Sequence, residues 1–256
     1  MPMQCAAVIE GGQTPFTKPE VAVSDIMAGM YAVTGILSAL VSRGTTGTGQ
    51  HIDVSLYDSQ VAWLANQNMN HLIGNETPGR LGTSHPNLVP YQSFSTLDGH
   101  LVLAIGTDRQ FFACVRCMEL DELAEDKRFQ TNAHRVAHRE SLVDILGKTF
   151  KKKDTATWLE VLSAAGIPAS SINTIAEIFS DPYAKERALV RMVEHPDAGK
   201  IPTVANPVRF SETPVSYRKA PPVLGEHTQE VLKDELGLED KTIQGLVDSG
   251  VIKGAR

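Results

Sequence analysis

The sequence predicts an α/β protein that carries a second, smaller α+β domain. Helix-like and strand-like periodicities alternate in residues 1–75, which is typical of an α/β layer. Residues 75–90 are rich in Gly, Pro, Asn, Ser and Thr and interrupt this pattern. The Asp98-Gly99 pair then indicates a β-hairpin. A new sheet therefore begins after the interruption, and two domains are expected.

The first helix is predicted over residues 24–43. Ser24 or Asp25 can cap its start, and Gly44 is placed to end it in a left-handed conformation. Its apolar residues follow the three-and-four spacing of one helix face: Ile26, Met27, Met30, Val33, Leu37, Leu40 and Val41. This face requires another surface for its burial.

A short strand and a second helix are predicted next. Residues 51–56 alternate between apolar and other side chains, which indicates a strand. Residues 61–72 have the apolar spacing of a helix, and Gly74 lies just past its end. The resulting order of helix, strand and helix is a piece of an α/β layer that cannot close a core alone.

Residues 76–190 are predicted to form the small α+β domain. Its strands are expected at residues 91–96, 100–105 and 167–172, and its helices at residues 109–118, 134–150, 155–165 and 174–179. Asp154 is placed to cap the helix that begins at residue 155, and Gly166 is placed to end it. Most of the chain's regular structure therefore lies in this domain.

The remaining residues, 191–256, are predicted to be a connector and helices that return to the large domain. Residues 188–193 and 199–204 read as extended segments, and residues 202–222 contain five prolines. Short amphipathic helices follow at residues 226–236 and 240–247. These C-terminal helices are expected to pack back onto the unit formed by residues 1–75.

Charge and hydropathy exclude two classes of partner. The 24 Lys and Arg residues face 30 Asp and Glu residues, and a net charge of -6 gives no basic field for nucleic acid or an anionic membrane. The longest apolar run, residues 28–41, contains Gly35 and Ser38 and falls short of the roughly 20 residues that span a bilayer. We therefore expect no nucleic acid and no membrane among the partners.

The cysteine content and residues 1–10 indicate the cellular compartment in which the protein is expected. Cys5, Cys114 and Cys117 are too few for a disulfide framework, and residues 1–10 lack the basic region of a secretory signal. We expect a reducing compartment, the cytoplasm, or the mitochondrial matrix if the protein is eukaryotic.

Two short motifs are interpreted as structural. Cys114 and Cys117 form a C-x-x-C inside a predicted helix rather than at a helix N-terminus, so core packing is favoured over redox chemistry. Gly44, Gly47 and Gly49 follow a helix and open a strand, whereas a phosphate-binding loop follows a strand and opens a helix. A structural turn is the interpretation for these glycines.

No metal site is expected at the paired histidines. His134 and His138 are four residues apart, as zinc ligands on a helix are, but no Glu base lies between them. Arg135 and Arg139 occupy the same turns. A solvated basic face is therefore favoured over a zinc site.

The loop over residues 80–87 is the best candidate for a binding site. It combines flexible backbone, hydrogen-bond donors and one imidazole directly before the predicted hairpin, and such a loop could cover a ligand. A plain interdomain linker is the alternative. The candidate residues are Arg80, Gly82, Thr83, Ser84, His85, Asn87 and Tyr91.

Several weak motifs in a specific order resemble one family. They are V-A-V-S-D-I-x-A-G at 21–29, T-G-x-G-Q-x-I-D-V-S-L at 46–56, G-x-x-H-P-x-x-x-P-Y-x-x-F at 82–94, T-N-x-x-R at 131–135, G-I-P-A at 166–169 and A-P-P-x-L-G-E-H-T at 220–228. Together they resemble the class III CoA-transferases, which include formyl-CoA, carnitine and glutarate CoA-transferases and share their fold with α-methylacyl-CoA racemases. The resemblance runs from Gly12 to Ile252.

The resemblance implies a fold, substrates and an assembly. The fold would be the C-terminal part of the class III CoA-transferase fold, with part of a nucleotide-fold-like large domain and a small α+β domain. The substrates would be an acyl-CoA and a small carboxylic acid, with the coenzyme A thioester as substrate and no permanently bound cofactor. Two subunits would interlock as a homodimer.

The resemblance also implies a mechanism whose central residue is not found here. Class III enzymes transfer CoA through an aspartyl anhydride and an aspartyl thioester. Their nucleophilic Asp lies upstream of the segment that matches Gly12, so we expect the chain to be truncated and name no catalytic residue in it. Asp25 matches a helix start, where capping is its expected role. The glycine-rich loop that excludes water in formyl-CoA transferase corresponds to residues 80–87.

Two alternatives stay open at this point. One is an enzyme similar to α-methylacyl-CoA racemase, which requires an acid/base pair that is also expected upstream. The other is a catalytically inactive, truncated form that acts as a binding partner.

Overall fold

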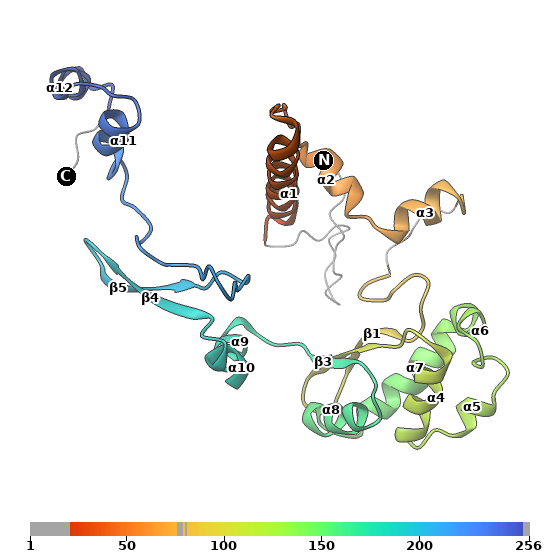
Figure 1. The fold of residues 1–256 in the computed structure, drawn as a ribbon. Coiled ribbons are helices and arrows are strands. Elements are labelled where there is room, and N and C mark those ends of the chain that lie inside the picture. Colours follow the sequence, from red (N-terminus) through yellow and green to blue (C-terminus); the bar gives the residue numbers. More distant parts are fainter. Residues whose placement is uncertain (1–20, 76–78, 80, 253–256) are drawn as a thin grey trace. The chain divides into compact units, whose positions relative to one another are not determined.

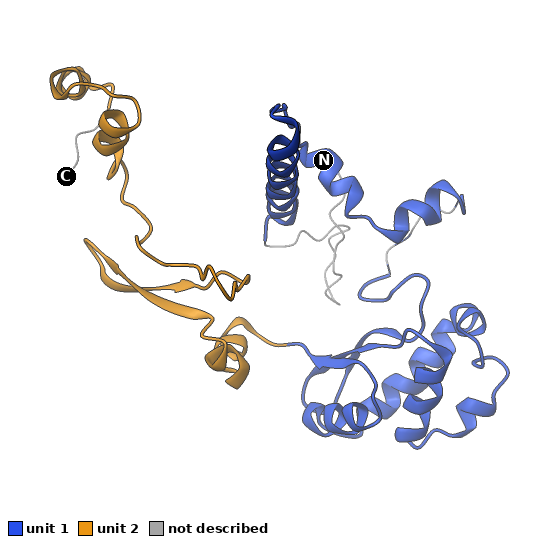
Figure 2. Cartoon of the chain, viewed as in Figure 1, with its two compact units in different colours: residues 1–172 blue, residues 173–256 orange. Residues whose placement is uncertain are grey.

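The computed structural model of the chain describes residues 21–75, 79 and 81–252. It divides into two compact units, residues 1–172 and residues 173–256 (Figures 1 and 2). The division into a large domain, a small domain and a returning segment stays a prediction, because the model does not place the units relative to one another.

The first unit holds three helices followed by a sheet with helices around it (Figure 1). Its elements are α1 (Val23–Thr46), α2 (Leu56–Ala62), α3 (Asn66–Leu72), β1 (Tyr91–Ser95), β2 (His100–Ala104), α4 (Asp108–Cys117), α5 (Glu122–Glu125), α6 (Asn132–Ala137), α7 (Arg139–Phe150), α8 (Thr155–Ala164) and β3 (Ala169–Ser171). The strands predicted at residues 91–96, 100–105 and 167–172 and the helices predicted at 109–118 and 155–165 are thereby confirmed, with shifted ends.

Helix α1 starts and ends differently from the prediction. It runs on past Gly44 and ends at Gly47, whose φ of 72° is left-handed and whose N–H donates to Arg43 O at 2.8 Å. The residue at the N-cap is Ala22, and no side chain caps the helix, so the capping role expected for Asp25 is wrong. Asp25 still lies in the first turn, where its charge suits the helix dipole.

The apolar face of α1 is exposed within its own unit. Among its apolar residues, Ile26, Met30, Val33, Leu37 and Leu40 are each 44–57% exposed. By length and composition α1 is also apolar enough to cross a membrane, which the sequence did not lead us to expect. The helix continues through the polar interruptions that broke the apolar run. Core helices of soluble proteins pass the same test.

The strand predicted over residues 51–56 is wrong. These residues make no strand, and Ser55 instead caps α2 by accepting hydrogen bonds from Tyr57 N at 3.1 Å and Asp58 N at 3.3 Å. The predicted second helix is also divided, because Ala65 has a φ of 50° between α2 and α3. An alternating pattern becomes a strand only where another strand supplies its backbone hydrogen bonds.

The core of the first unit lies on an antiparallel sheet of order β1-β2-β3. Phe94 pairs with Leu101 across the predicted Asp-Gly hairpin, and Leu103 pairs with Ala169 on the other side of β2. Helices α4, α5, α7 and α8 and the segments that connect the elements supply further core residues. The largest fully buried apolar side chains are Trp158, Phe111, Phe129, Phe150, Leu101, Leu103, Ile105, Leu142, Leu146, Leu162 and Val89.

The helix predicted over residues 134–150 is two helices. The backbone of His138 leaves the helical region, with φ of -115° and ψ of 29°, and separates α6 from α7. As a result Arg139 begins a new helix, and its side chain can reach the loop before β1.

The second unit has little buried apolar surface of its own. It consists of α9 (Ile175–Ser180), α10 (Pro182–Glu186), β4 (Val190–His195), β5 (Gly199–Val204), α11 (Thr228–Asp234) and α12 (Asp240–Asp248). Strands β4 and β5 form an antiparallel hairpin. Within the described part of this unit, only Ala184, Val193 and Ile243 are buried apolar residues. The hairpin therefore lacks the packed face that normally stabilises a two-stranded sheet.

Candidate functional site

The candidate loop folds back onto strand β1. His85 N–H donates to Tyr91 O at 2.8 Å, and Ser84 Oγ donates to Gln92 Oε1 at 2.9 Å. The Thr83 hydroxyl lies 2.7 Å from that of Ser93. Hydrogen bonds therefore hold the loop against the first strand of the sheet. Gly82 turns the chain there with a φ of 61°, and Arg80 lies outside the described residues.

The His85 ring is held in one orientation. Its Nδ1 accepts hydrogen bonds from Asn87 N and Leu88 N, both at 3.1 Å. The ring stacks on Tyr91 with centroids 5.2 Å apart and an interplanar angle of 19°. Burial, and then the positive charge of Arg139, lower the pKa of His85 below its ordinary value. A ring nitrogen that accepts two N–H groups carries no proton, so the imidazole is neutral.

Arg139 binds the loop from helix α7. Its Nη2 donates to His85 O at 2.9 Å and to Pro86 O at 2.8 Å, whereas its Nη1 is buried and has no hydrogen-bond partner among the described residues. Burial lowers the pKa of this guanidinium. The interpretation of Arg139 as part of a solvated basic face is therefore wrong.

Asparagine side chains join the loop to the helices on either side. Asn87 Oδ1 accepts from Asn66 Nδ2 at 2.8 Å and from Asn70 Nδ2 at 3.2 Å, and both donors lie on α3. Asn132 of α6 bonds the loop backbone, donating to Asn87 O at 2.7 Å and accepting from Val89 N at 3.2 Å. These hydrogen bonds connect both helices to the middle of the loop.

Arg135 is a buried cation beneath the end of the loop. Its guanidinium donates to Val89 O at 2.7 Å, to Phe129 O at 2.9 Å and to Asp108 Oδ1 at 2.8 Å, and it lies 4.4 Å from the centre of the Phe111 ring. Its side chain is 1% exposed, and burial lowers its pKa. The expected solvated face is wrong here too, because a full set of acceptors replaces water.

The paired histidines lie on the surface, whereas the paired cysteines lie in or beside the core. His134 and His138 are exposed, and the described residues contain no cluster of three or more His, Cys, Asp or Glu side chains arranged as metal ligands. Cys114 is fully buried in the core, as predicted, and Cys117 is half-buried beside it. The neighbouring thiol of Cys117, then burial, raises the pKa of Cys114, and the neighbouring thiol of Cys114 lowers the pKa of Cys117.

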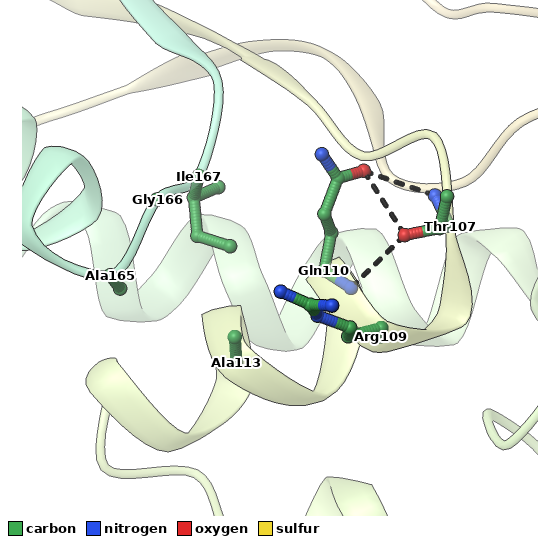
Figure 3. A pocket seen from close by; sticks show the side chains of 7 residues that line it. All are labelled: Thr107, Arg109, Gln110, Ala113, Ala165, Gly166 and Ile167. Atoms are coloured by element: carbon green, nitrogen blue, oxygen red, sulfur yellow. Dashed lines mark hydrogen bonds between the residues drawn. The ribbon is translucent and has the colours of Figure 1, made fainter.

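A surface pocket lies where α4 begins and α8 leads into β3 (Figure 3). Its volume is about 420 Å³, and its lining residues are Thr107, Arg109, Gln110, Ala113, Ala165, Gly166 and Ile167. Thr107 and Gln110 form a capping box that satisfies the first N–H groups of α4. None of the described loop residues lines this pocket. Sequence reasoning missed it, although the Thr-x-x-Gln capping signature was readable.

A model of CoA-transferase family III matches residues 4–228 of the chain. The chain belongs to CoA-transferase family III. It is 37% identical to human succinyl-CoA:glutarate CoA-transferase over 235 residues, which cover 92% of this chain and 54% of the relative. It is 42% identical to the succinate–glutarate CoA-transferase of Agrobacterium fabrum over 217 residues, 85% of this chain and 54% of the relative. The chain thus spans about half the length of these relatives.

The fold class is confirmed by a solved structure. The chain is similar to a CAIB/BAIF family protein from Brucella suis with a TM-score of 0.67 and 37% identity, over 91% of this chain and 60% of that one. The resemblance that the ordered motifs indicated is likewise confirmed. In this family III chain, the G-x-x-H-P block forms the loop, and T-N-x-x-R supplies two of the side chains, Asn132 and Arg135, that hold its end.

Proposed function

We propose that the protein to which this chain belongs moves coenzyme A from an acyl-CoA to a small carboxylic acid. The main support is the match of residues 4–228 to the family. The human and Agrobacterium fabrum relatives named above are CoA-transferases. Coenzyme A acts as the thioester substrate, and no permanently bound cofactor takes part. The acceptor that best fits is a small dicarboxylate such as succinate or glutarate, since the named relatives act on these acids.

The proposed chemistry proceeds through an enzyme aspartate. Its carboxylate attacks the thioester carbonyl carbon, the C–S bond breaks and CoA leaves as the thiolate. The thiolate then attacks the aspartyl carbonyl of the mixed anhydride, which releases the donor acid and leaves aspartyl-CoA. The acceptor carboxylate takes CoA by the same two steps in reverse. We infer that this aspartate is supplied from outside these 256 residues, as the family pattern implies.

The loop over residues 80–87 has the proposed role of covering the anhydride. An anhydride hydrolyses if water reaches it, so a cover raises the yield of transfer. The contacts of Thr83 and Ser84 with β1, and of Arg139 with His85 and Pro86, support an ordered cover. Further parts of the proposal are a homodimer, a large domain from residues 1–75 and 191–256, and a cytoplasmic or mitochondrial-matrix location.

The test follows labelled CoA in the natural polypeptide that contains these residues. Labelled succinyl-CoA with glutarate is expected to yield labelled glutaryl-CoA, and a control without acceptor should keep the label on succinyl-CoA. Loss of α-deuterium from a 2-methylacyl-CoA, with no transfer to any dicarboxylate, would contradict the proposal and favour a racemase.

A further inference from the structure

Two His-Pro turns of this chain share one geometry. In the first, His85 Nδ1 accepts from the N–H groups two and three residues on, at 3.1 Å each. In the second, between β4 and β5, His195 Nδ1 accepts from Asp197 N and Ala198 N, also at 3.1 Å each. Both contacts are those of an Asx-like turn in which an imidazole nitrogen replaces a side-chain oxygen. In the first turn the His85 Nδ1 is unprotonated, so the neutral ring of His85 carries its proton on Nε2.

The surroundings distinguish His85 from His195. The His85 ring is stacked on Tyr91 of β1, and Arg139 of α7 binds the carbonyl groups of His85 and Pro86. These are the titratable and charged groups that face the ring from the described elements packed on it. Arg139 opposes a second positive charge on the ring and favours an anion near it. Within the described part of the chain, Nε2 has no hydrogen-bond partner, so its N–H can bind a ligand.

We propose that His85 binds a carboxylate oxygen of the substrate through its Nε2–H, as a neutral hydrogen-bond donor, and that Arg139 is the positioning residue that holds it there. This inference rests on the proposed function, because the loop is taken to cover the transfer site. It assigns His85 to substrate binding and excludes it as a general base, since the free ring nitrogen already carries the proton. A donor beside a cation fits a dicarboxylate better than an uncharged acyl chain.

Two substitutions of His85 distinguish the role of Nδ1 in the turn from the role of Nε2 in ligand binding. The Asn side chain of His85→Asn keeps an acceptor where Nδ1 lies, and so keeps the turn, but lacks the distal N–H. The Gln side chain of His85→Gln reaches further and places an N–H where Nε2 lies. His195→Asn is the matched control, because it makes the same exchange in the same kind of turn, the one between β4 and β5.

The measurement is the KM and kcat for glutarate and for a monocarboxylate of equal length in the natural polypeptide. His85→Asn is expected to raise the KM for glutarate about tenfold or more, the effect of losing one charge-assisted hydrogen bond, while the variant stays folded. His85→Gln should recover part of the loss, and His195→Asn should match the unsubstituted protein. Equal KM values for His85→Asn and the unsubstituted protein would overturn the proposal. Absence of any transfer by the unsubstituted protein would instead overturn the proposed function.

A spectroscopic measurement tests the tautomer without activity. The ¹⁵N shifts of the His85 ring in the 256-residue chain should show an unprotonated Nδ1 and a protonated Nε2 at neutral pH. In Arg139→Met, removal of the cation should raise the pKa of His85 toward its ordinary value. A proton on Nδ1 in the unsubstituted chain would contradict the assignment, whatever the kinetics.

Discussion

Arg135 and Arg139 lie four residues apart, and both bind backbone carbonyl groups at the end of the candidate loop. Arg135 reaches Val89 O, and Arg139 reaches His85 O and Pro86 O. In sequence they form, with His134 and His138, a pattern that is typical of a solvated face. Only the two histidines are exposed: Arg135 is buried, and the break at His138 places Arg139 on the next helix, partly buried against the loop.

Replacement of Arg135 by alanine is expected to destabilise the protein by about 2–5 kcal/mol. Val89 O and Phe129 O would lose their donors, and each unsatisfied buried carbonyl costs about 1–3 kcal/mol. Urea unfolding measures the free energy. Arg128→Ala serves as the control, because its ion pair with Asp126 is exposed and should contribute little. Equal effects of the two substitutions would mean that Arg135 is solvated.

At the scale of elements, hydrogen bonds to β1 and to Arg139 hold the backbone of the loop before β1 in a defined conformation. Gly82 lies in the loop over residues 80–87 and Gly79 directly precedes it, and the two glycines have different backbone requirements. Gly82 has a φ of 61°, whereas Gly79 is not left-handed, and an added Cβ at either position would meet no atom within 4 Å. Any difference between alanine substitutions at the two positions must therefore come from the backbone and not from packing.

Gly82→Ala is expected to cost about 1–2 kcal/mol of folding free energy, because an L side chain is strained in the left-handed region. Gly79→Ala should be neutral or slightly stabilising, since alanine restricts the unfolded chain. Paired denaturant titrations of the two variants give the comparison. No cost at Gly82 would indicate that the loop does not hold this conformation.

The elements differ in how well the sequence predicts them. The β1–β2 hairpin was predictable, because an Asp-Gly turn and alternating flanks are local signals. The strand at residues 51–56 was not, since a strand also requires a partner that no local pattern reveals. The division of the second helix at Ala65 lacked any Gly or Pro signal, and alanine favours the helix interior.

At the scale of the whole chain, apolar burial is concentrated in one region. The core cluster extends from Val89 to Ile167, whereas no residue of α1 is buried and the described part of the second unit buries three apolar side chains. Because apolar burial is the main stabilising contribution, stability should be just as uneven.

Hydrogen exchange of the 256-residue chain is expected to show strong protection only within residues 89–171. Amides of β1, β2, α4, α7 and α8 should exchange by global unfolding, since these elements surround the core. Amides of α1 and of the β4–β5 hairpin should exchange many times faster. Mass spectrometry of peptides measures this protection. Equal protection throughout the chain would show that α1 and the second unit are buried by contacts other than those within each unit.

Local sequence motifs and their order were enough to predict the family, the hairpin, most helices of the small domain and the loop that contains His85. It could not indicate which nitrogen of His85 is free, that Arg139 binds the loop, or that Arg135 is buried. The contacts of Arg135 and Arg139 with the loop depend on acceptors 46 to 54 residues away in the chain, whereas the free nitrogen of His85 depends on how the turn after it folds onto the ring. The hydropathy of an arginine predicts that its side chain stays in water. The fold decides whether backbone carbonyl groups replace that water, as they do for Arg135 and Arg139.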